Sequence, residues 1–124
     1  MEKLNLEVIS IVFDQSQNVC AVWTFGSAKD GVVRAGSDLD LGVLFFKKPS
    51  FDELTKLRKE LTLALAFEDI DLVPLNEAPP LLAFEAISGK RLYCRDQGAK
   101  AEFVSRAARE YESENYLIER SLKS

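Results

Sequence analysis

The sequence contains no histidine and only two cysteines, which removes several common kinds of active-site chemistry. Without histidine, an imidazole cannot act as acid, base or nucleophile, and His-ligated zinc is excluded. Cys20 and Cys94 lie inside apolar runs and lack metal-ligand spacing, so we expect them to be buried, free thiols in a reducing compartment. Catalysis by this chain would therefore have to rely on carboxylates.

The chain also lacks long apolar stretches and any excess of positive charge. No apolar run approaches the ~20 residues that a membrane-spanning helix needs, and the N-terminus shows no signal-peptide pattern, so we expect a cytoplasmic protein. The net charge of −4 disfavours direct binding to nucleic acid. With 124 residues, we expect a single domain over residues 1–124, without room for a separate acceptor-binding domain.

A possible anion-binding turn follows the first strong strand pattern. The apolar run Val19–Phe25 ends at Gly26-Ser27, where the chain can turn sharply and free backbone amides can face a phosphate. The Ser27 hydroxyl would add a donor, and Lys29 and Arg34 are close enough in sequence to neutralise phosphate charge. The alternative is that Ser27 only caps the turn and that both basic residues are ordinary surface residues.

Carboxylates follow this turn at a regular spacing. Ten residues after Ser27, the sequence Asp38-Leu39-Asp40 precedes a second apolar run. Residues two apart on a strand project from one face, so Asp38 and Asp40 would form a carboxylate pair suited to a divalent metal. Further along, Asp69 and Asp71 share a strand face, and either could join the pair if the strands are neighbours. Without a metal, these acids would be turn and strand-end residues.

The remaining patterns predict an α+β fold with a small mixed sheet flanked by helices. We expect helices from Glu2 to about Asp14, from a capping box at Ser50 to Leu65, from about Pro80 to Ile87 and from about Gln97 to Leu122, and further strands at Asp69–Val73 and Arg91–Cys94. Helical spacing predicts that the buried helix faces include Leu4, Val8, Ile11, Val12, Leu54, Leu57, Leu61, Ala64, Leu65, Leu81, Leu82, Phe84, Ile87, Val104, Ala108, Tyr111, Ile118 and Leu122. The long terminal helix is expected to bend or break near Glu114. The sequence leaves open whether its apolar stripe packs on the domain or on a partner, for which Tyr111 and Tyr116 would offer an amphipathic surface.

The spacing from Gly26-Ser27 to Asp38-Leu39-Asp40 resembles the signature of the nucleotidyltransferase superfamily that includes DNA polymerase beta. The small size of the chain and its stretch DIDLVPLNEAPPLL are similar to the minimal nucleotidyltransferases, the MntA-type antitoxin partners of HEPN ribonuclease toxins. The resemblance covers roughly residues 19–95. It implies a polymerase beta-like fold and a nucleotidyltransferase activity.

The resemblance also implies a site and a partner. It selects Asp71 over Asp69 as the third carboxylate, with Mg²⁺ or Mn²⁺ held by Asp38, Asp40 and Asp71 and with Asp71 helping to deprotonate the attacking hydroxyl. It further implies ATP as the donor, a tyrosine hydroxyl of a HEPN toxin as the acceptor, and a hetero-oligomer of the two proteins.

Two other functions stay open. One is a nucleotidyltransferase acting on a small molecule, of the aminoglycoside-modifying type, and the other is a non-catalytic antitoxin that masks its partner by contact. The turn departs from the family pattern, which commonly has an aromatic-alanine-arginine run after Gly-Ser. This chain has Ala28-Lys29-Asp30 there, which places an additional acid near the expected phosphates.

Overall fold

The structure is a computed structural model that describes the backbone of residues 2–34 and 36–123 and the side chains of residues 3–34 and 36–114. The strands are β1 (Glu2–Lys3), β2 (Val19–Phe25), β3 (Val32–Val33), β4 (Leu39–Phe45), β5 (Ile70–Pro74) and β6 (Lys90–Cys94). The helices are α1 (Leu6–Asp14), the 3₁₀ turn η1 (Gly26–Ala28), α2 (Phe51–Leu65), α3 (Pro80–Ile87) and α4 (Gln97–Lys123).

Four strands form the main sheet in the order β5-β4-β2-β6. The β4–β5 pair is parallel, whereas β2 is antiparallel to both of its neighbours. A parallel pair needs a crossover connection, and α2 provides it between β4 and β5. The sheet is therefore mixed, and the predicted α+β class with a long C-terminal helix is confirmed.

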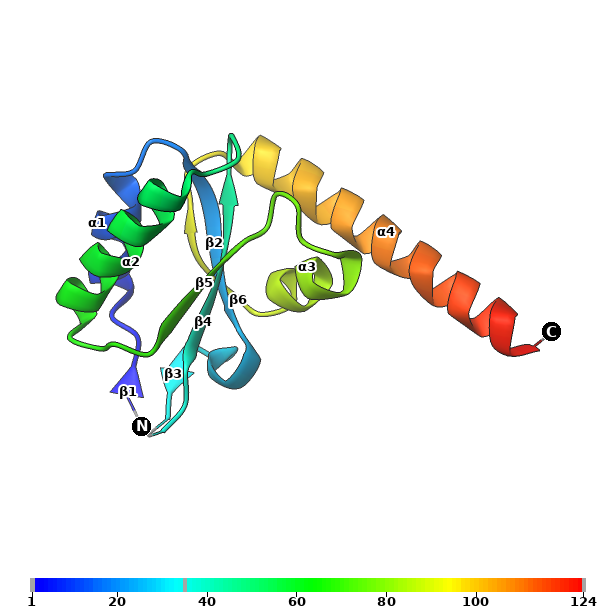
Figure 1. Cartoon of the computed structure of the whole chain (residues 1–124), viewed down its shortest axis with the longest axis horizontal. Helices are drawn as coiled ribbons and strands as arrows, with labels where there is room; N and C mark the ends of the chain where they lie inside the picture. The colour runs from blue at the N-terminus through cyan, green and yellow to red at the C-terminus, as the bar shows by residue number, and fades with distance from the viewer. Residues whose placement is uncertain (1, 35, 124) are drawn as a thin grey trace.

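The helices cover the sheet in two layers. Figure 1 shows α1 and α2 on one side, α3 and the first part of α4 on the other, and the C-terminal part of α4 extending away from the sheet. Strand residues alternate between the layers: Leu39, Leu41 and Val43 pack with α1 and α2, whereas Leu44 packs with α3 and α4. All seven residues of β2 are buried because helices lie on both of its faces.

Capping side chains set the start of two helices. Asn5 accepts the amide of Val8 at α1, and Ser50 accepts the amide of Glu53 at α2, as the capping pattern predicts. The return half of that capping box is not made, because the Glu53 carboxylate accepts hydrogen bonds from the side chain of Asn18 instead. This contact ties the start of α2 to the turn before β2.

The N-terminal prediction is wrong at its first residues. Glu2 and Lys3 form β1 and pair with β3, so the helix begins only at Leu6. The buried face of α1 consists of Ile9, Val12 and Phe13. Ile11, expected on that face, is 56% exposed. Val12 is buried and Val8 is half-buried, as predicted, so the error concerns Ile11 alone; apolar residues occur on both sides of this helix, and periodicity did not separate them.

Two further residues expected on buried faces are exposed. Leu81 of α3 is 54% exposed, because the small residues Ala83 and Ala86 make the close contact with the sheet. Ala64 of α2 is also exposed, while Leu57 and Leu61 of the same helix are buried as predicted. The helix positions were therefore predicted better than their orientation.

Helix α4 packs against the sheet through its first half. Phe103 and Ala107 are buried there, and the Phe103 ring lies 6.3 Å from that of Trp23. The Tyr111 ring stacks on Phe84 of α3 at 4.0 Å. Val104 and Ala108, predicted on the buried face, are half-buried. The break expected near Glu114 is absent, because α4 is one helix from Gln97 to Lys123, and Figure 1 shows no kink in it.

The side chains of Tyr116, Ile118 and Leu122 lie outside the described residues. Within the part of the chain that is described, no helix has both the length and the apolar character to cross a membrane. Cys20 and Cys94 are both free, as predicted. Cys20 is buried, which raises the pKa of its thiol, and Cys94 is half-buried.

Candidate active site

Asp40 and Asp71 lie next to each other on neighbouring strands. Their Cα atoms are partners in the parallel pairing of β4 with β5, so both side chains project from the same face of the sheet. That face is the one covered by α3 and α4, because Leu39 and Ile70, one residue earlier on each strand, pack in the opposite layer. The sequence left the pairing of these strands open, and the structure brings the two carboxylates together.

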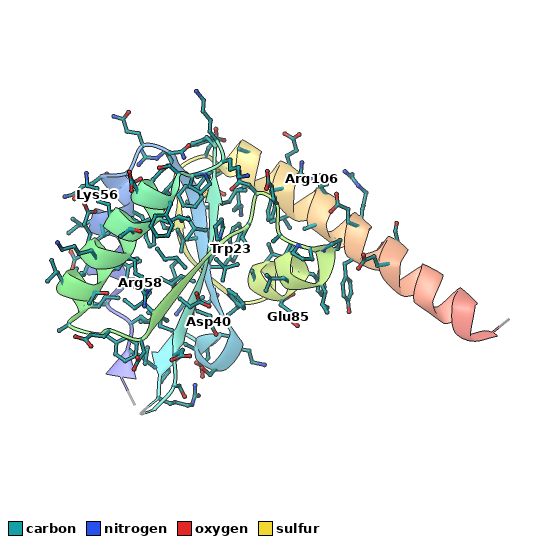
Figure 2. All side chains as sticks on the ribbon, in the orientation of Figure 1. Trp23, Asp40, Lys56, Arg58, Glu85 and Arg106 are labelled. Atoms are coloured by element: carbon teal, nitrogen blue, oxygen red, sulfur yellow. The ribbon has the colours of Figure 1, made fainter. Side chains whose placement is uncertain are left out.

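The helical cover ends before it reaches these carboxylates. A Cβ at Gly42, the next residue of β4 on this face, would lie 2.9 Å from the Cβ of Ala86, so α3 touches the strand there. Asp40 is partly exposed and Asp71 is exposed. Figure 2 shows Asp40 at the end of the sheet beside the η1 turn, away from α4. The carboxylates therefore lie at an open end of the sheet.

Gly26 begins the turn directly against Asp40. Its φ of +66° is in the left-handed region, and a Cβ at this position would overlap with the Asp40 carboxylate. Glycine is thus required here both by the backbone and by the space available. The next residue, Ser27, donates its hydroxyl to the carbonyl oxygen of Asp38 at 3.2 Å. This bond holds the turn against the start of β4.

The electrostatics of the site are dominated by like charges. Burial, followed by the charges of Asp71 and then Asp38, raises the pKa of Asp40. Among the described residues, the ion pairs formed involve none of these three carboxylates. Their mutual repulsion is therefore uncompensated by protein cations, and a bound cation would relieve it.

The donor set fits a hard divalent cation, although the side chains do not form a finished cage. In the described part of the chain, no three acidic or cysteine side chains converge closely enough to hold an ion as they stand. The three aspartates offer carboxylate oxygens only, which is the ligand type that Mg²⁺ and Mn²⁺ prefer. Because position 26 is a glycine, the Asp40 carboxylate can lie directly against the backbone of the turn.

The two basic residues expected to face the phosphates, Lys29 and Arg34, differ from each other in their contacts. Lys29 is exposed at the end of η1. Arg34 forms an ion pair with Asp30 at 2.7 Å and donates to the carbonyl oxygen of Ser27 at 2.9 Å. Sequence reasoning treated Asp30 only as an additional acid and missed this pairing, which the opposite charges four residues apart could have suggested.

The choice between Asp69 and Asp71 is supported by the geometry of β5. Asp69 precedes the strand, and its carbonyl oxygen accepts the amide of Leu39 at 2.8 Å. Asp71, but not Asp69, is among the charges that raise the pKa of Asp40. Asp71 is therefore the better candidate for the third carboxylate.

A comparison of the sequence with protein-family profiles identifies the family of this chain. The profile described as "Polymerase beta, Nucleotidyltransferase" matches residues 7–98, which include the turn and all three carboxylates. The chain belongs to this family. The expected nucleotidyltransferase class is thereby confirmed. No curated protein matches the chain.

Several solved structures have the same polymerase beta nucleotidyltransferase fold as this chain. A chain of a toxin–antitoxin complex with AMP-PNP is 25% identical, with a TM-score of 0.76 and coverage of 98% of this chain and 100% of that one. A chain of a tri-AMPylated Shewanella oneidensis HEPN toxin in complex with MNT antitoxin is 22% identical, with a TM-score of 0.66 and coverage of 95% and 94%. A chain of the toxin–antitoxin MntA-HepT has the same identity and TM-score and a coverage of 95% of both chains. The last two likenesses show the fold alone.

Proposed function

We propose that this chain is a metal-dependent nucleotidyltransferase that neutralises a HEPN toxin by transferring AMP from ATP to a tyrosine hydroxyl of that toxin. The observation that carries the proposal is the pairing of Asp40 with Asp71 in register, beside Asp38 and the Gly26 turn. A triphosphate-binding turn and a carboxylate cluster at one end of a sheet are the two parts that nucleotidyl transfer requires.

The turn would bind the phosphates of ATP. The first amides of a helical turn have no partner within the turn, so they can donate to phosphate oxygens. The hydroxyl of Ser27 and the ammonium of Lys29 would add a donor and a positive charge. Because Gly26 has no side chain, the Asp40 carboxylate lies directly against the turn, so a cation held by Asp40 would lie beside the bound phosphates.

The carboxylates of Asp38, Asp40 and Asp71 would hold one or two divalent cations, with Mg²⁺ or Mn²⁺ as the expected ions. When bound, such ions neutralise phosphate charge and make a coordinated hydroxyl more acidic. The Asp40 side chain and the backbone of Asp38 lie against the turn, so these two residues would connect the phosphates to the reaction centre. Asp71 would face the side from which the acceptor enters, since it is exposed whereas its strand partner Asp40 is only partly exposed.

The reaction would then be an in-line displacement at the α-phosphorus. The acceptor oxygen forms a bond to this phosphorus, the bond from the phosphorus to the bridging oxygen of the β-phosphate breaks, and pyrophosphate leaves. A carboxylate oxygen of Asp71 accepts the hydroxyl proton. The contribution of the protein would consist mainly of positioning and electrostatic stabilisation.

The solved structures support the choice of donor and partner. One similar complex is described with AMP-PNP, an analogue of ATP, and another contains a HEPN toxin that carries AMP groups. Both similar chains are covered almost completely by this one. The cytoplasm is the compartment that this proposal implies, because ATP is available there and the two cysteines can stay reduced.

Intact-mass spectrometry tests the proposal directly. The chain is mixed with a purified HEPN protein encoded beside it, ATP and Mg²⁺. We expect the partner to gain the mass of one or more AMP groups, and to gain none with Asp38→Ala. Inhibition of the toxin without a mass change, and equally by Asp38→Ala, would instead establish a masking antitoxin. Modification of a small hydroxylated compound in the absence of a partner would favour the aminoglycoside-type reaction.

A further inference from the structure

The guanidinium of Arg34 folds back onto the turn that precedes it. Its Nη1 atom donates to the carbonyl oxygens of Ser27 at 2.9 Å and Val32 at 3.3 Å, and to a carboxylate oxygen of Asp30 at 3.4 Å. Its Nη2 atom donates to the other carboxylate oxygen of Asp30 at 2.7 Å. A planar fork suits such a two-pronged contact, which a lysine could not reproduce.

Asp30 connects this fork to the backbone of the same loop. Its carboxylate accepts the amide of Val32 at 3.1 Å, in addition to the guanidinium. The hydrogen bond from Arg34, followed by that from Val32, lowers the pKa of Asp30 to about 2. The pair is therefore fully ionised at neutral pH. Arg34 and Asp30 together close the loop between η1 and β3.

The contact with Ser27 links this loop to the candidate active site. In a trans peptide, the carbonyl of Ser27 and the amide of Ala28 belong to one plane and point in opposite directions. By holding the Ser27 carbonyl, Arg34 fixes the direction of the Ala28 amide. The Ser27 hydroxyl is in turn bonded to Asp38, at the start of β4.

We propose that Arg34 is a positioning residue, which holds the Ser27–Ala28 peptide and the Ser27 side chain in place, rather than a direct ligand of the triphosphate. Three of its four contacts are to Asp30 and Val32, in the segment between η1 and Arg34 itself, and these contacts already use both terminal nitrogens. Asp30, which replaces the basic residue common in the family, is the counter-ion that keeps the guanidinium there. The nucleotide part of this inference rests on the proposed function, whereas the ordering of the turn does not.

Hydrogen exchange without nucleotide tests the ordering of the turn. In Arg34→Met, we expect the amides of Gly31 and Val32 to exchange about fivefold faster, the effect of losing one exposed ion-pair network. Lys29→Met removes a cation from the same turn and serves as the matched control, because Lys29 contributes to the turn through its backbone amide, which donates to the carbonyl oxygen of Gly26. Unchanged exchange in Arg34→Met, or an equal increase in Lys29→Met, would overturn the proposal.

Kinetics with ATP and Mg²⁺ separates positioning from direct binding. Arg34→Met is measured alone and in an Asp30→Asn background. A positioning residue depends on its partner, so the rise in KM for ATP, about fivefold in the natural chain, should shrink when Asp30 is already neutral. We also expect kcat to fall less than KM rises. A direct phosphate ligand would show an equal or larger KM effect in the Asp30→Asn background.

Arg34→Lys provides the second comparison. It keeps the charge but loses the fork, so we expect it to behave like Arg34→Met in both exchange and KM. Full rescue by lysine would show that only the charge matters and would overturn the proposal. If the natural chain transfers no AMP, the proposed function fails, but the exchange experiment still decides whether Arg34 orders the turn.

Discussion

The two faces of the sheet are covered to different extents. On the face below α1 and α2, the core extends along the whole of β4, from Leu39 to Phe45. On the opposite face, α3 reaches β4 at Gly42, and the next residue on that face, Asp40, is left partly exposed with the charge of Asp71 beside it. One face is built for packing along its full length, and the other is packed at one end only.

Within β4, residues on one face therefore contribute to stability, and residues at the open end of the other face are available for chemistry. From Asp38 to Leu41, at the start of β4, aspartates of the candidate site alternate with buried leucines, so the same backbone serves both purposes. The closed face fixes the position of the strand, and the open end can then hold like charges close together at a cost in folding free energy. Substitutions on the two faces should therefore affect different measurements.

The largest effect is expected from Asp38→Ala/Asp40→Ala. Loss of both carboxylates removes the expected metal site, so AMP transfer should fall on the order of a thousandfold or more. ATP should then bind equally well with and without Mg²⁺ in calorimetry. The thermal midpoint should not fall, because the substitution also removes repulsion with Asp71. Metal-dependent ATP binding that survives in the double variant would refute the metal assignment.

Leu61→Ala tests the closed face. Leu61 is completely buried between α2 and the sheet, so its truncation should lower the free energy of unfolding by about 2–5 kcal/mol. Urea unfolding measures this change. The control is Leu63→Ala in the same helix, where the side chain is 74% exposed and the expected change is within about 0.5 kcal/mol. Similar losses in both variants would mean that α2 is oriented differently.

Asp71→Asn should act on the reaction step and leave the fold intact. Loss of a positioned proton acceptor typically lowers a rate by about a hundredfold or more, so transfer should fall on that scale while much of the ATP binding is retained. Single-turnover kinetics with saturating ATP would measure it. Asp69→Asn is the matched control, because it makes the same substitution two residues earlier, just before β5. This variant should transfer AMP at nearly the natural rate. The reverse result would move the role to Asp69.

Local patterns predicted the elements of this fold well. The strand Val19–Phe25 was predicted with its observed bounds, because a continuous apolar run lies between a polar turn and a glycine. The cap at Ser50 was also predicted, since it depends only on residues within one turn. In contrast, β1 and β3 contain two residues each, too few to show any periodicity, and they form only because distant segments pair.

For the candidate site, too, the sequence predicted local features but not the contacts between distant segments. Alternation along a strand predicted that Asp38 and Asp40 share a face, but the register that sets Asp71 beside Asp40 is a tertiary feature. Likewise, sequence spacing suggested Arg34 as a phosphate ligand and gave no information on where its side chain folds. The roles of these residues as metal or phosphate ligands stay predictions that the variants above can test.

The smallest effect concerns two acids on either side of the Gly26 turn. The hydrogen bond from Arg34 lowers the pKa of Asp30 to about 2, whereas burial and the neighbouring aspartates raise the pKa of Asp40 above its ordinary value of 3.8. Asp30 therefore stabilises the folded state above pH 3.8, and this contribution is lost as the pH falls towards about 2. Ionised Asp40 does the opposite, so its cost disappears as the pH falls through its raised pKa.

Carboxyl NMR titration of the chain with a chelator present would resolve the two groups. Of these two carboxylates, Asp40 should take up its proton at the higher pH and Asp30 at the lower pH. In Arg34→Met, the midpoint of Asp30 should return towards 3.8, while that of Asp40 should hardly move, because Arg34 is not among the groups that perturb it. Equal midpoints for both acids in the natural chain would mean that the open end of the sheet carries no concentrated negative charge. The contrast between the packed and the open face would then be one of shape alone.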